Sequence, residues 1–165
     1  MAAALDTGRL SRIRIGVYAS PGACPSARAI AAHGGSMACV TAARHHGLWT
    51  LADDDEPHVW LKTGQRAHHG SSCGCVEHWD RDLRPTASGA LPLRQVLRQI
   101  LGCRGPEHFF VTLESALRQR RLTTADLRWL RMHTNARGRE ALQLARADAD
   151  SELESLLRWR LRTLG

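Results

Sequence analysis

Cysteine and histidine side chains in the middle of the chain supply the sulfur and nitrogen donors that soft or borderline metal ions prefer. Cys73, Cys75 and His78 form the densest such group. On a regular strand the two cysteines would point to one face and His78 to the other. A structural zinc site normally takes four ligands, usually in two pairs, and only His68 and His69 of the preceding loop could complete this one. We therefore expect free thiols here, no metal ion and no cofactor.

Other groups of potential ligands have simpler structural explanations. His45 and His46 end a predicted helix, where a protonated imidazole interacts favourably with the helix dipole. The acidic run of residues 53–56 could hold a hard cation such as Mg²⁺, but it lacks the spaced ligands of a calcium loop, so a solvated turn is favoured. The five cysteines are an odd number without a regular framework, which favours free thiols over disulfides.

The sequence contains no motif that identifies an enzyme. It contains no nucleophile elbow, no phosphate-binding glycine loop and no dinucleotide-binding fingerprint. Glu154 is the one carboxylate that we consider as a catalytic candidate, and it has two structural explanations. Together with Ser151 it matches the spacing of a capping box, and it lies four residues before Arg158, with which it can form an ion pair.

The chain is strongly basic, and its basic residues are almost all arginine. The formal net charge is +7, and of the 23 basic residues only Lys62 is a lysine. Arginine suits bidentate contacts with phosphate, and basic faces are typical of proteins that bind nucleic acid. A solvated basic surface, encoded by a GC-rich genome, is the alternative explanation of the same composition.

Residues 8–19 (GRLSRIRIGVYA) are the most strand-like stretch of the chain. Apolar β-branched residues alternate with Arg12 and Arg14, which predicts a short β-hairpin with an apolar side packed inward and an arginine side in water. Gly16 can take the turn conformation that its β-branched neighbours cannot. An ordinary amphipathic edge hairpin is the favoured interpretation of this pattern. The alternative is the wing of a winged-helix module, in which Arg9, Arg12 and Arg14 are the candidate DNA-binding residues.

The spacing of apolar residues in the rest of the sequence predicts an α+β fold, in which the short β-hairpin and a small antiparallel sheet precede a mainly helical C-terminal half. Pro85, Ser88 and Gly89 suggest that the residues between the two parts form a linker. The expected elements are helices at residues 26–32 and 37–46 (Ser36 as N-cap), strands at 58–62 and 72–79, a linker at 83–90, and helices that begin near residues 92, 106, 123, 140 and 148.

The last helix has a leucine stripe at helical spacing, formed by Leu153, Leu156, Leu157 and Leu161. Because so short a helix is marginal by itself in water, we expect these leucines to pack against the preceding long helices. Arg158 falls largely off the stripe and is expected to stay in water.

Several stretches together resemble a group of mostly actinobacterial multidomain proteins. In these proteins an AbiEi-like regulatory region precedes a nuclease domain related to the very-short-patch-repair endonucleases. Each stretch is a loose apolar pattern, and their common order carries the resemblance. The stretches are GRLSRIRIGVYASP, SMACVTAARHHGLW, HVWL, FFVTLESALRQRRLTTADLRWL and DADSELESLLRWRLRTLG.

The resemblance implies three parts. Residues 1–22 correspond to the remnant of a winged-helix wing, residues 23–147 to the AbiEi-like α+β region, and residues 148–165 to the first helix of the nuclease domain. Glu154 aligns with the first acidic residue of that domain, but the rest of its carboxylate–lysine set does not follow in this sequence. The resemblance thus implies a protein cut at both ends: a fragment, a mispredicted reading frame, or a decayed or phage-borne copy.

We therefore expect a non-enzymatic, basic regulatory or interaction domain of a defence or toxin–antitoxin type protein. It would associate with DNA, or with a protein partner or a second copy through its terminal helix. A remnant of a metal-dependent DNA endonuclease that uses Glu154 is the alternative. No apolar run approaches the roughly 20 residues of a membrane-spanning helix, and no signal peptide is evident, so we expect no membrane partner and a cytoplasmic location.

Overall fold

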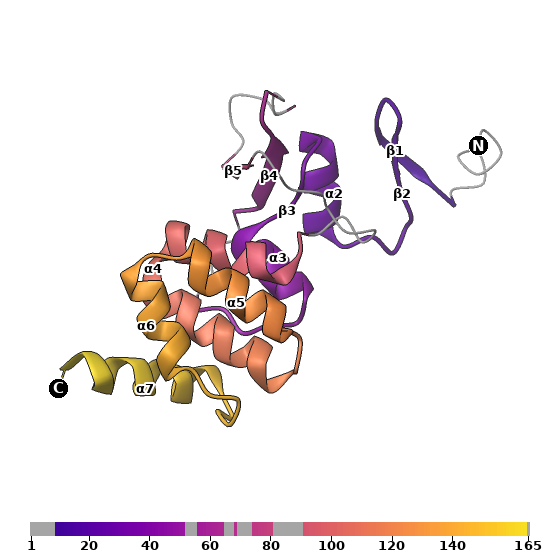
Figure 1. The fold of residues 1–165 in the computed structure, drawn as a ribbon. Coiled ribbons are helices and arrows are strands. Elements are labelled where there is room, and N and C mark those ends of the chain that lie inside the picture. Colours follow the sequence, from indigo (N-terminus) through magenta and orange to yellow (C-terminus); the bar gives the residue numbers. More distant parts are fainter. Residues whose placement is uncertain (1–8, 52–55, 65–67, 69–73, 81–90, 165) are drawn as a thin grey trace.

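The computed structural model describes residues 9–51, 56–64, 68, 74–80 and 91–164 of the chain. It divides into a projecting β-hairpin, a small sheet with two short helices, and a helical C-terminal half (Figure 1). The α+β fold class is confirmed. The expected linker at residues 83–90 lies outside the described residues, as do Cys73, His69 and most of the acidic run.

The predicted hairpin is confirmed as strands β1 (Ser11–Arg14) and β2 (Val17–Ala19), which pair antiparallel. Gly16 has a φ of +78° in the turn, a conformation that favours glycine. The expected alternation of faces fails near the turn, because the register shifts between Arg12 and Arg14. Such an irregularity re-aims the side chains that follow it.

Helix α2 (Pro25–His33) has a proline in its first turn and ends at Gly34 in the left-handed conformation, as glycine permits. The prediction of Ser36 as the N-cap of the next helix is wrong, because β3 (Ser36–Met37) pairs with a neighbouring strand. Helix α3 (Cys39–His45) begins after it. The backbone at Gly35 lies close to the strand that pairs with β3, since a Cβ added at Gly35 would lie 2.4 Å from the carbonyl oxygen of Trp60 in that strand.

The small sheet has the strand order β3–β4–β5, with β4 (His58–Lys62) in the centre. Strand β3 is antiparallel to β4, but β5 (Val76–Asp80) is parallel to it, so the sheet is mixed and not wholly antiparallel as expected. Parallel neighbours need a crossover of about a dozen residues or more. The long segment between Lys62 and Val76 provides that length.

The helical half is built around α4 (Leu93–Arg118), against which α3, α5, α6 and α7 all pack. The range of α4 is broken at Gly105, which has a non-helical φ of +84° and is followed by Pro106, so the two helices expected on either side of this position are both present. The later helices are α5 (Thr124–His133), α6 (Ala136–Leu144) and α7 (Glu152–Leu164). The largest fully buried apolar side chains come from both parts: Leu61, Leu91, Leu97, Ile100, Phe109, Phe110, Leu113 and Leu130.

Side-chain caps explain where two of the later helices begin. Helix α5, expected to begin near residue 123, starts with a capping box, in which Thr123 and Asp126 form reciprocal hydrogen bonds. Helix α6 begins earlier than residue 140, because the Asn135 side chain accepts the N–H of Gly138 and caps it there.

Helix α7 packs on α4 through a different face from the one expected. Trp159 is buried against Phe110, with ring centroids 5.1 Å apart. Leu153, Leu157 and Leu161 are 57–68% exposed, so the prediction that these three are buried is wrong. None of the described helices combines the length and apolarity needed to cross a bilayer.

Candidate functional site

Four residues that are distant in sequence bring metal-binding donor atoms together. Cys39 is the first residue of α3, His58 the first residue of β4, His78 lies in β5 and Cys103 in α4. One donor atom of each lies within 4.8 Å of the donor atoms of the other three. We call Cys39, His58, His78 and Cys103 the Cys–His cluster. Cys39 and His58 are buried, His78 is half-buried and Cys103 is exposed.

The parallel register of the sheet places the two histidines together. Trp60 is opposite His78 across the β4–β5 ladder, and His58 lies two residues before Trp60 on the same face of β4. The imidazole rings of His58 and His78 are stacked, with centroids 5.1 Å apart. Nδ1 of His58 is 2.9 Å from Nε2 of His78, so the two nitrogens face each other.

Hydrogen bonds hold Cys39 beside the histidines. The Cys39 N–H donates to the side-chain oxygen of Gln99 on α4, at 3.0 Å. The neighbouring Ala38 N–H donates to the carbonyl oxygen of His58, whose own N–H donates to the hydroxyl of Thr41. Cys39 has a φ of +47°, which is uncommon for a residue other than glycine and costs energy that the surrounding contacts must supply.

Arg104, next to Cys103 on α4, fixes the tautomer of His58 in this structure. Its guanidinium lies 3.0 Å from Nε2 of His58. Since arginine can only donate, Nε2 of His58 is the acceptor, and its Nδ1–H donates to Nε2 of His78. A proton therefore occupies the space between the two rings.

The environment of the cluster favours uncharged side chains in the absence of a cation. Burial lowers the pKa of both His58 and His78 to about 4. Burial, together with the neighbouring Cys103, raises the pKa of the Cys39 thiol to about 12. Neutral imidazoles nevertheless offer a lone pair to a soft cation, and thiols release their protons when they bind one, so the site has the chemistry of a metal-binding centre.

The spacing of these residues along the chain gave no signal of the site. The sequence places His78 close to Cys75, but Cys75 precedes β5 and is not a member of the cluster. The usual paired ligand motif is absent because each ligand comes from a different element. The prediction of no metal ion stays a prediction.

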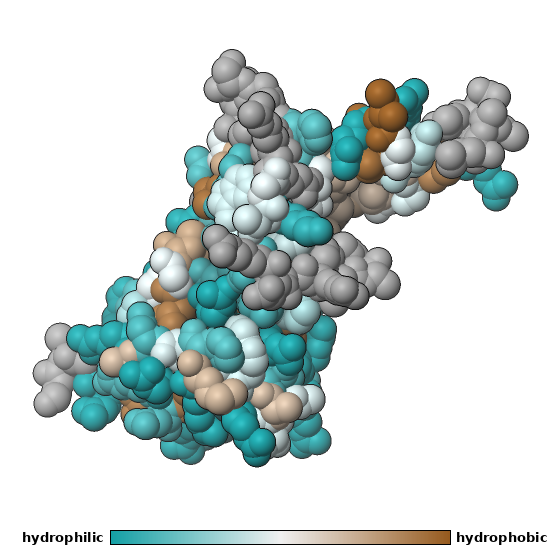
Figure 2. All heavy atoms as spheres, turned by 45° about the horizontal axis from the view of Figure 1, so that its top comes forward, coloured by the Kyte–Doolittle hydropathy of each residue, from teal (hydrophilic) through white to brown (hydrophobic). Residues whose placement is uncertain are grey.

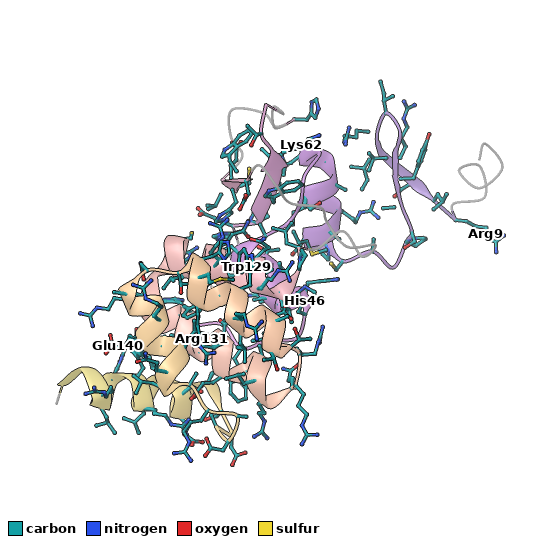
Figure 3. The ribbon with its side chains drawn as sticks, in the orientation of Figure 1. Arg9, His46, Lys62, Trp129, Arg131 and Glu140 are labelled. Atoms are coloured by element: carbon teal, nitrogen blue, oxygen red, sulfur yellow. The ribbon has the colours of Figure 1, made fainter. Side chains whose placement is uncertain are left out.

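The candidate DNA-binding arginines lie on or beside the β1–β2 hairpin. Arg9 and Arg12 are exposed, and Arg9 points away from the body of the molecule (Figure 3). Arg14 instead turns back, and its Nε donates to the carbonyl oxygen of Ala31 in α2 at 3.0 Å. The structure thus separates the three residues: two are available to a ligand, while the third holds the hairpin on α2.

The turn of this hairpin exposes an apolar side chain. Ile15 is 83% exposed, the largest exposure among the large hydrophobic residues of the described chain. Figure 2 shows strongly hydrophobic atoms on the projecting hairpin, flanked by hydrophilic ones.

A second arginine, Arg28 of α2, donates to the hydroxyl of Ser11 at 2.9 Å and, like Arg14, holds the hairpin in place.

Glu154 makes the predicted ion pair with Arg158, but one bond differs from the expected capping box, because its carboxylate accepts the N–H of Asp150, the residue before the expected N-cap Ser151. Its backbone N–H donates to the Ser151 hydroxyl, and its carboxylate accepts the N–H of Asp150 and pairs with Arg158 at 3.1 Å. These contacts are those of a helix start and an i,i+4 ion pair. It lies outside the cluster of potential metal ligands found among the described residues.

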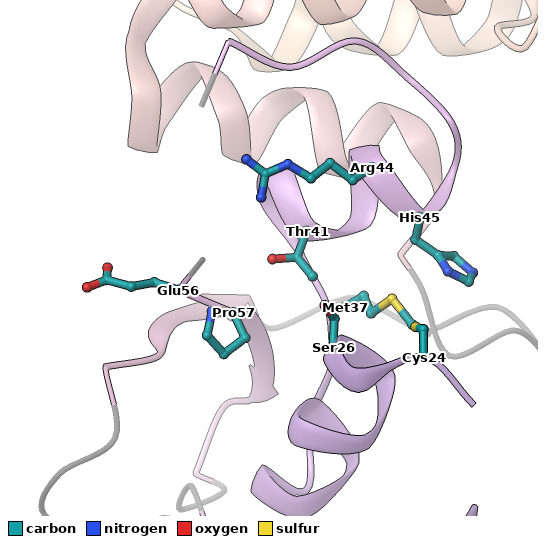
Figure 4. A pocket seen from close by; sticks show the side chains of 8 residues that line it. All are labelled: Cys24, Ser26, Met37, Thr41, Arg44, His45, Glu56 and Pro57. Carbon is teal, nitrogen blue, oxygen red and sulfur yellow. The ribbon is translucent and has the colours of Figure 1, made fainter. Parts of the chain in front are cut away.

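A pocket lies near the Cys–His cluster, between α2, α3 and the start of β4 (Figure 4). Arg44 and Glu56 supply opposite charges to its wall, and Thr41, which accepts the N–H of His58, belongs to its lining. These side chains are mixed in type and suggest no particular ligand.

Comparison with known proteins found no match: no family model matches the chain, and no curated protein matches it. The resemblance to AbiEi-like proteins therefore stays a prediction.

Proposed function

We propose that this chain is a non-enzymatic, basic regulatory domain that associates with DNA through its β1–β2 hairpin. The observation that carries the proposal is the hairpin itself, which projects from the body with Arg12 exposed and Ile15 at its turn (Figure 1). Arginine side chains neutralise phosphates, and an exposed aliphatic side chain beside them is what groove-binding proteins insert between bases.

The anchoring of the hairpin supports the same proposal. Arg14 and Arg28 bond it to α2 from two sides, so its exposed residues are presented in a defined direction. The resemblance to AbiEi-like proteins implies a role in a defence or toxin–antitoxin system and a cytoplasmic location, and the net charge of +7 is in keeping with a phosphate-rich partner.

The contacts of Glu154 support a non-enzymatic role. A catalytic metal needs several ligands held around it, whereas the carboxylate of Glu154 is engaged by Asp150 and Arg158. We expect no metal-dependent cleavage of single- or double-stranded DNA. Cleavage that disappears in Glu154→Ala would instead support the endonuclease alternative.

A salt titration of DNA binding tests the proposal. Fluorescence anisotropy with a labelled duplex should give an affinity that falls steeply with salt, with a log–log slope of about −0.9 for each phosphate contact. Arg12→Ala should weaken binding and reduce the magnitude of that slope by about one. Arg137→Ala, which removes an exposed arginine of α6 that pairs with Glu140, is the matched control and should change neither.

Two outcomes would refute it. If the intact chain shows no salt-dependent binding, DNA is not the partner. If Arg12→Ala and Arg137→Ala have equal effects, binding does not use the hairpin.

The exposed leucines of α7 favour a second candidate, contact with a second copy of the chain. Leu153, Leu157 and Leu161 recur at intervals of four residues and stay exposed, and a contiguous apolar stripe on a helix is typical of helix–helix association. Sedimentation velocity over a range of concentrations should detect a dimer that Leu157→Glu dissociates. A monomer at every concentration would refute this candidate.

A further inference from the structure

We propose that Cys39, His58, His78 and Cys103 form a structural zinc site that joins the small sheet to the helical half. This goes beyond the proposed association with DNA and rests on separate observations. Two thiolates and two imidazoles are a common ligand set of structural zinc. Oxygen-preferring Mg²⁺ and Ca²⁺ do not match these donors.

The distances are close to those of a tetrahedral site. With Zn–S bonds of about 2.3 Å and Zn–N bonds of about 2.0–2.1 Å, tetrahedral ligand atoms lie about 3.3–3.8 Å apart. Here the four donor atoms all lie within 4.8 Å of one another. The largest separation thus exceeds the required one by only about 1–1.5 Å, which small side-chain rotations can close.

The ion would replace the proton between the two imidazole rings. Nδ1 of His58 and Nε2 of His78, which lie 2.9 Å apart, would be the two nitrogens that bind the ion. On binding, the His58 proton moves from Nδ1 to Nε2, and the thiols of Cys39 and Cys103 each release a proton to solvent. Two thiolates then balance the charge of Zn²⁺, so the centre is neutral overall and its burial carries little cost.

Arg104 must shift when the ion binds. Once Nε2 of His58 carries a proton, it can no longer accept from the guanidinium that now lies 3.0 Å away. The guanidinium can turn toward the new thiolate of Cys103, the adjacent residue, and so remain close to negative charge. The arginine is therefore compatible with the loaded site, although it occupies a different position in it.

The origin of the ligands shows what the ion would do. Cys39, His58 and His78 come from the sheet and the helix that follows β3, while Cys103 comes from α4. Between β5 and α4 the structure also has an ion pair of Asp80 with Arg98. A zinc ion would add coordination bonds across this same junction, and metal-binding free energy becomes folding free energy.

Cys103 offers a ligand change that should leave the fold intact, because it is the exposed member of the cluster. Cys75, which is half-buried beside β5 but outside the cluster, is the matched control. The reduced chain is purified, incubated with Zn²⁺ and dialysed, and its zinc content is measured by elemental analysis. The wild type and Cys75→Ser should each retain one zinc per chain, and Cys103→Ser should lose it while its circular dichroism stays unchanged.

Two further measurements make the result decisive. Substitution with Co²⁺ should give the visible absorption bands of tetrahedral cobalt with thiolate charge transfer in Cys75→Ser but not in Cys103→Ser. Zinc should also raise the melting temperature of the wild type and leave that of Cys103→Ser unchanged. Wild-type protein without zinc, zinc retained by Cys103→Ser, or a Cys39–Cys103 disulfide in the native protein would each overturn the proposal.

Discussion

Replacement of Arg158 should lower the stability of the protein, because this side chain forms an ion pair with a buried carboxylate where α7 packs on α4. The carboxylate of Glu114 on α4 is completely buried, and the guanidinium of Arg158 reaches it at 2.7 Å. The side chain of Arg158 is 27% exposed, which corrects the expectation that it stays in water. The N–H of Arg146 donates to the same carboxylate oxygen, so Glu114 connects α4 with α7 and with the segment before it.

Arg158→Ala leaves the Glu114 carboxylate buried without its cationic partner. Breaking a buried pair from one side costs about 3–5 kcal/mol, against a total stability of about 5–15 kcal/mol for a domain. At about 2–4 °C for each kcal/mol, the melting temperature should fall by roughly 6–20 °C.

The chain contains a matched control on the same two helices. Arg160 of α7 pairs with Glu107 of α4 at 2.8 Å, but its side chain is 59% exposed. Exposed pairs contribute about 0–1 kcal/mol, so Arg160→Ala should have little effect. Urea denaturation of both variants, with slopes compared to exclude loss of two-state behaviour, gives the two free energies.

The double variant Glu114→Gln/Arg158→Ala completes the test, because it also removes the negative charge. It should be more stable than the sum of the two single effects predicts. Equal losses in Arg158→Ala and Arg160→Ala, or strict additivity in the double variant, would show that burial of Glu114 does not govern this contact.

Three further changes have defined outcomes. Gly35→Ala should destabilise the β3–β4 pair and lower the melting temperature, because its Cβ would lie 2.4 Å from the carbonyl oxygen of Trp60; an unchanged melting temperature would contradict this. Thr123→Ala should cost about 0.5–2 kcal/mol at neutral pH through loss of the cap. Partial burial raises the pKa of the Asp126 carboxyl, but hydrogen bonds from Thr123 outweigh it and hold that pKa below its ordinary value. The stabilisation by the cap is therefore present above the unfolded-state pKa and is lost as the pH falls through the folded-state pKa. The difference between wild type and Thr123→Ala in urea should therefore shrink in acid. Truncation after Ala149 should lower the melting temperature, since it removes the buried Trp159; an unchanged value would mean that α7 does not belong to this fold.

Local signals in the sequence predicted much of the helical half. The capping box at Thr123 and the break at Gly105 act within a few residues, so both could be recognised from sequence. The orientation of α7 could not, because Trp159 and Leu157 are both apolar and periodicity alone does not say which faces α4. The contact of Trp159 with the ring of Phe110, which is distant in sequence, determines which face of α7 packs on α4.

The sheet and the Cys–His cluster depend on long-range pairing. A strand pattern identifies HVWLK as β4 but says nothing of whether its neighbour runs parallel. With β5 antiparallel, the register that brings His58 beside His78 would be lost. The cluster could therefore be found only after the β4–β5 pairing and the position of Cys103 on α4 were known.

The proposed zinc site and the proposed DNA contact of the hairpin can be tested separately, although one structural path connects them. Helix α2 supports the hairpin through Arg14 and Arg28 and leads through β3 to Cys39, the buried zinc ligand. An ion at Cys39 would order the end of this path and so restrict the motion of α2 relative to α4. Arg12→Ala should then weaken DNA binding without changing the zinc content. Cys103→Ser should remove zinc yet leave the salt slope of DNA binding unaltered, because the number of phosphate contacts depends on the hairpin and not on the ion.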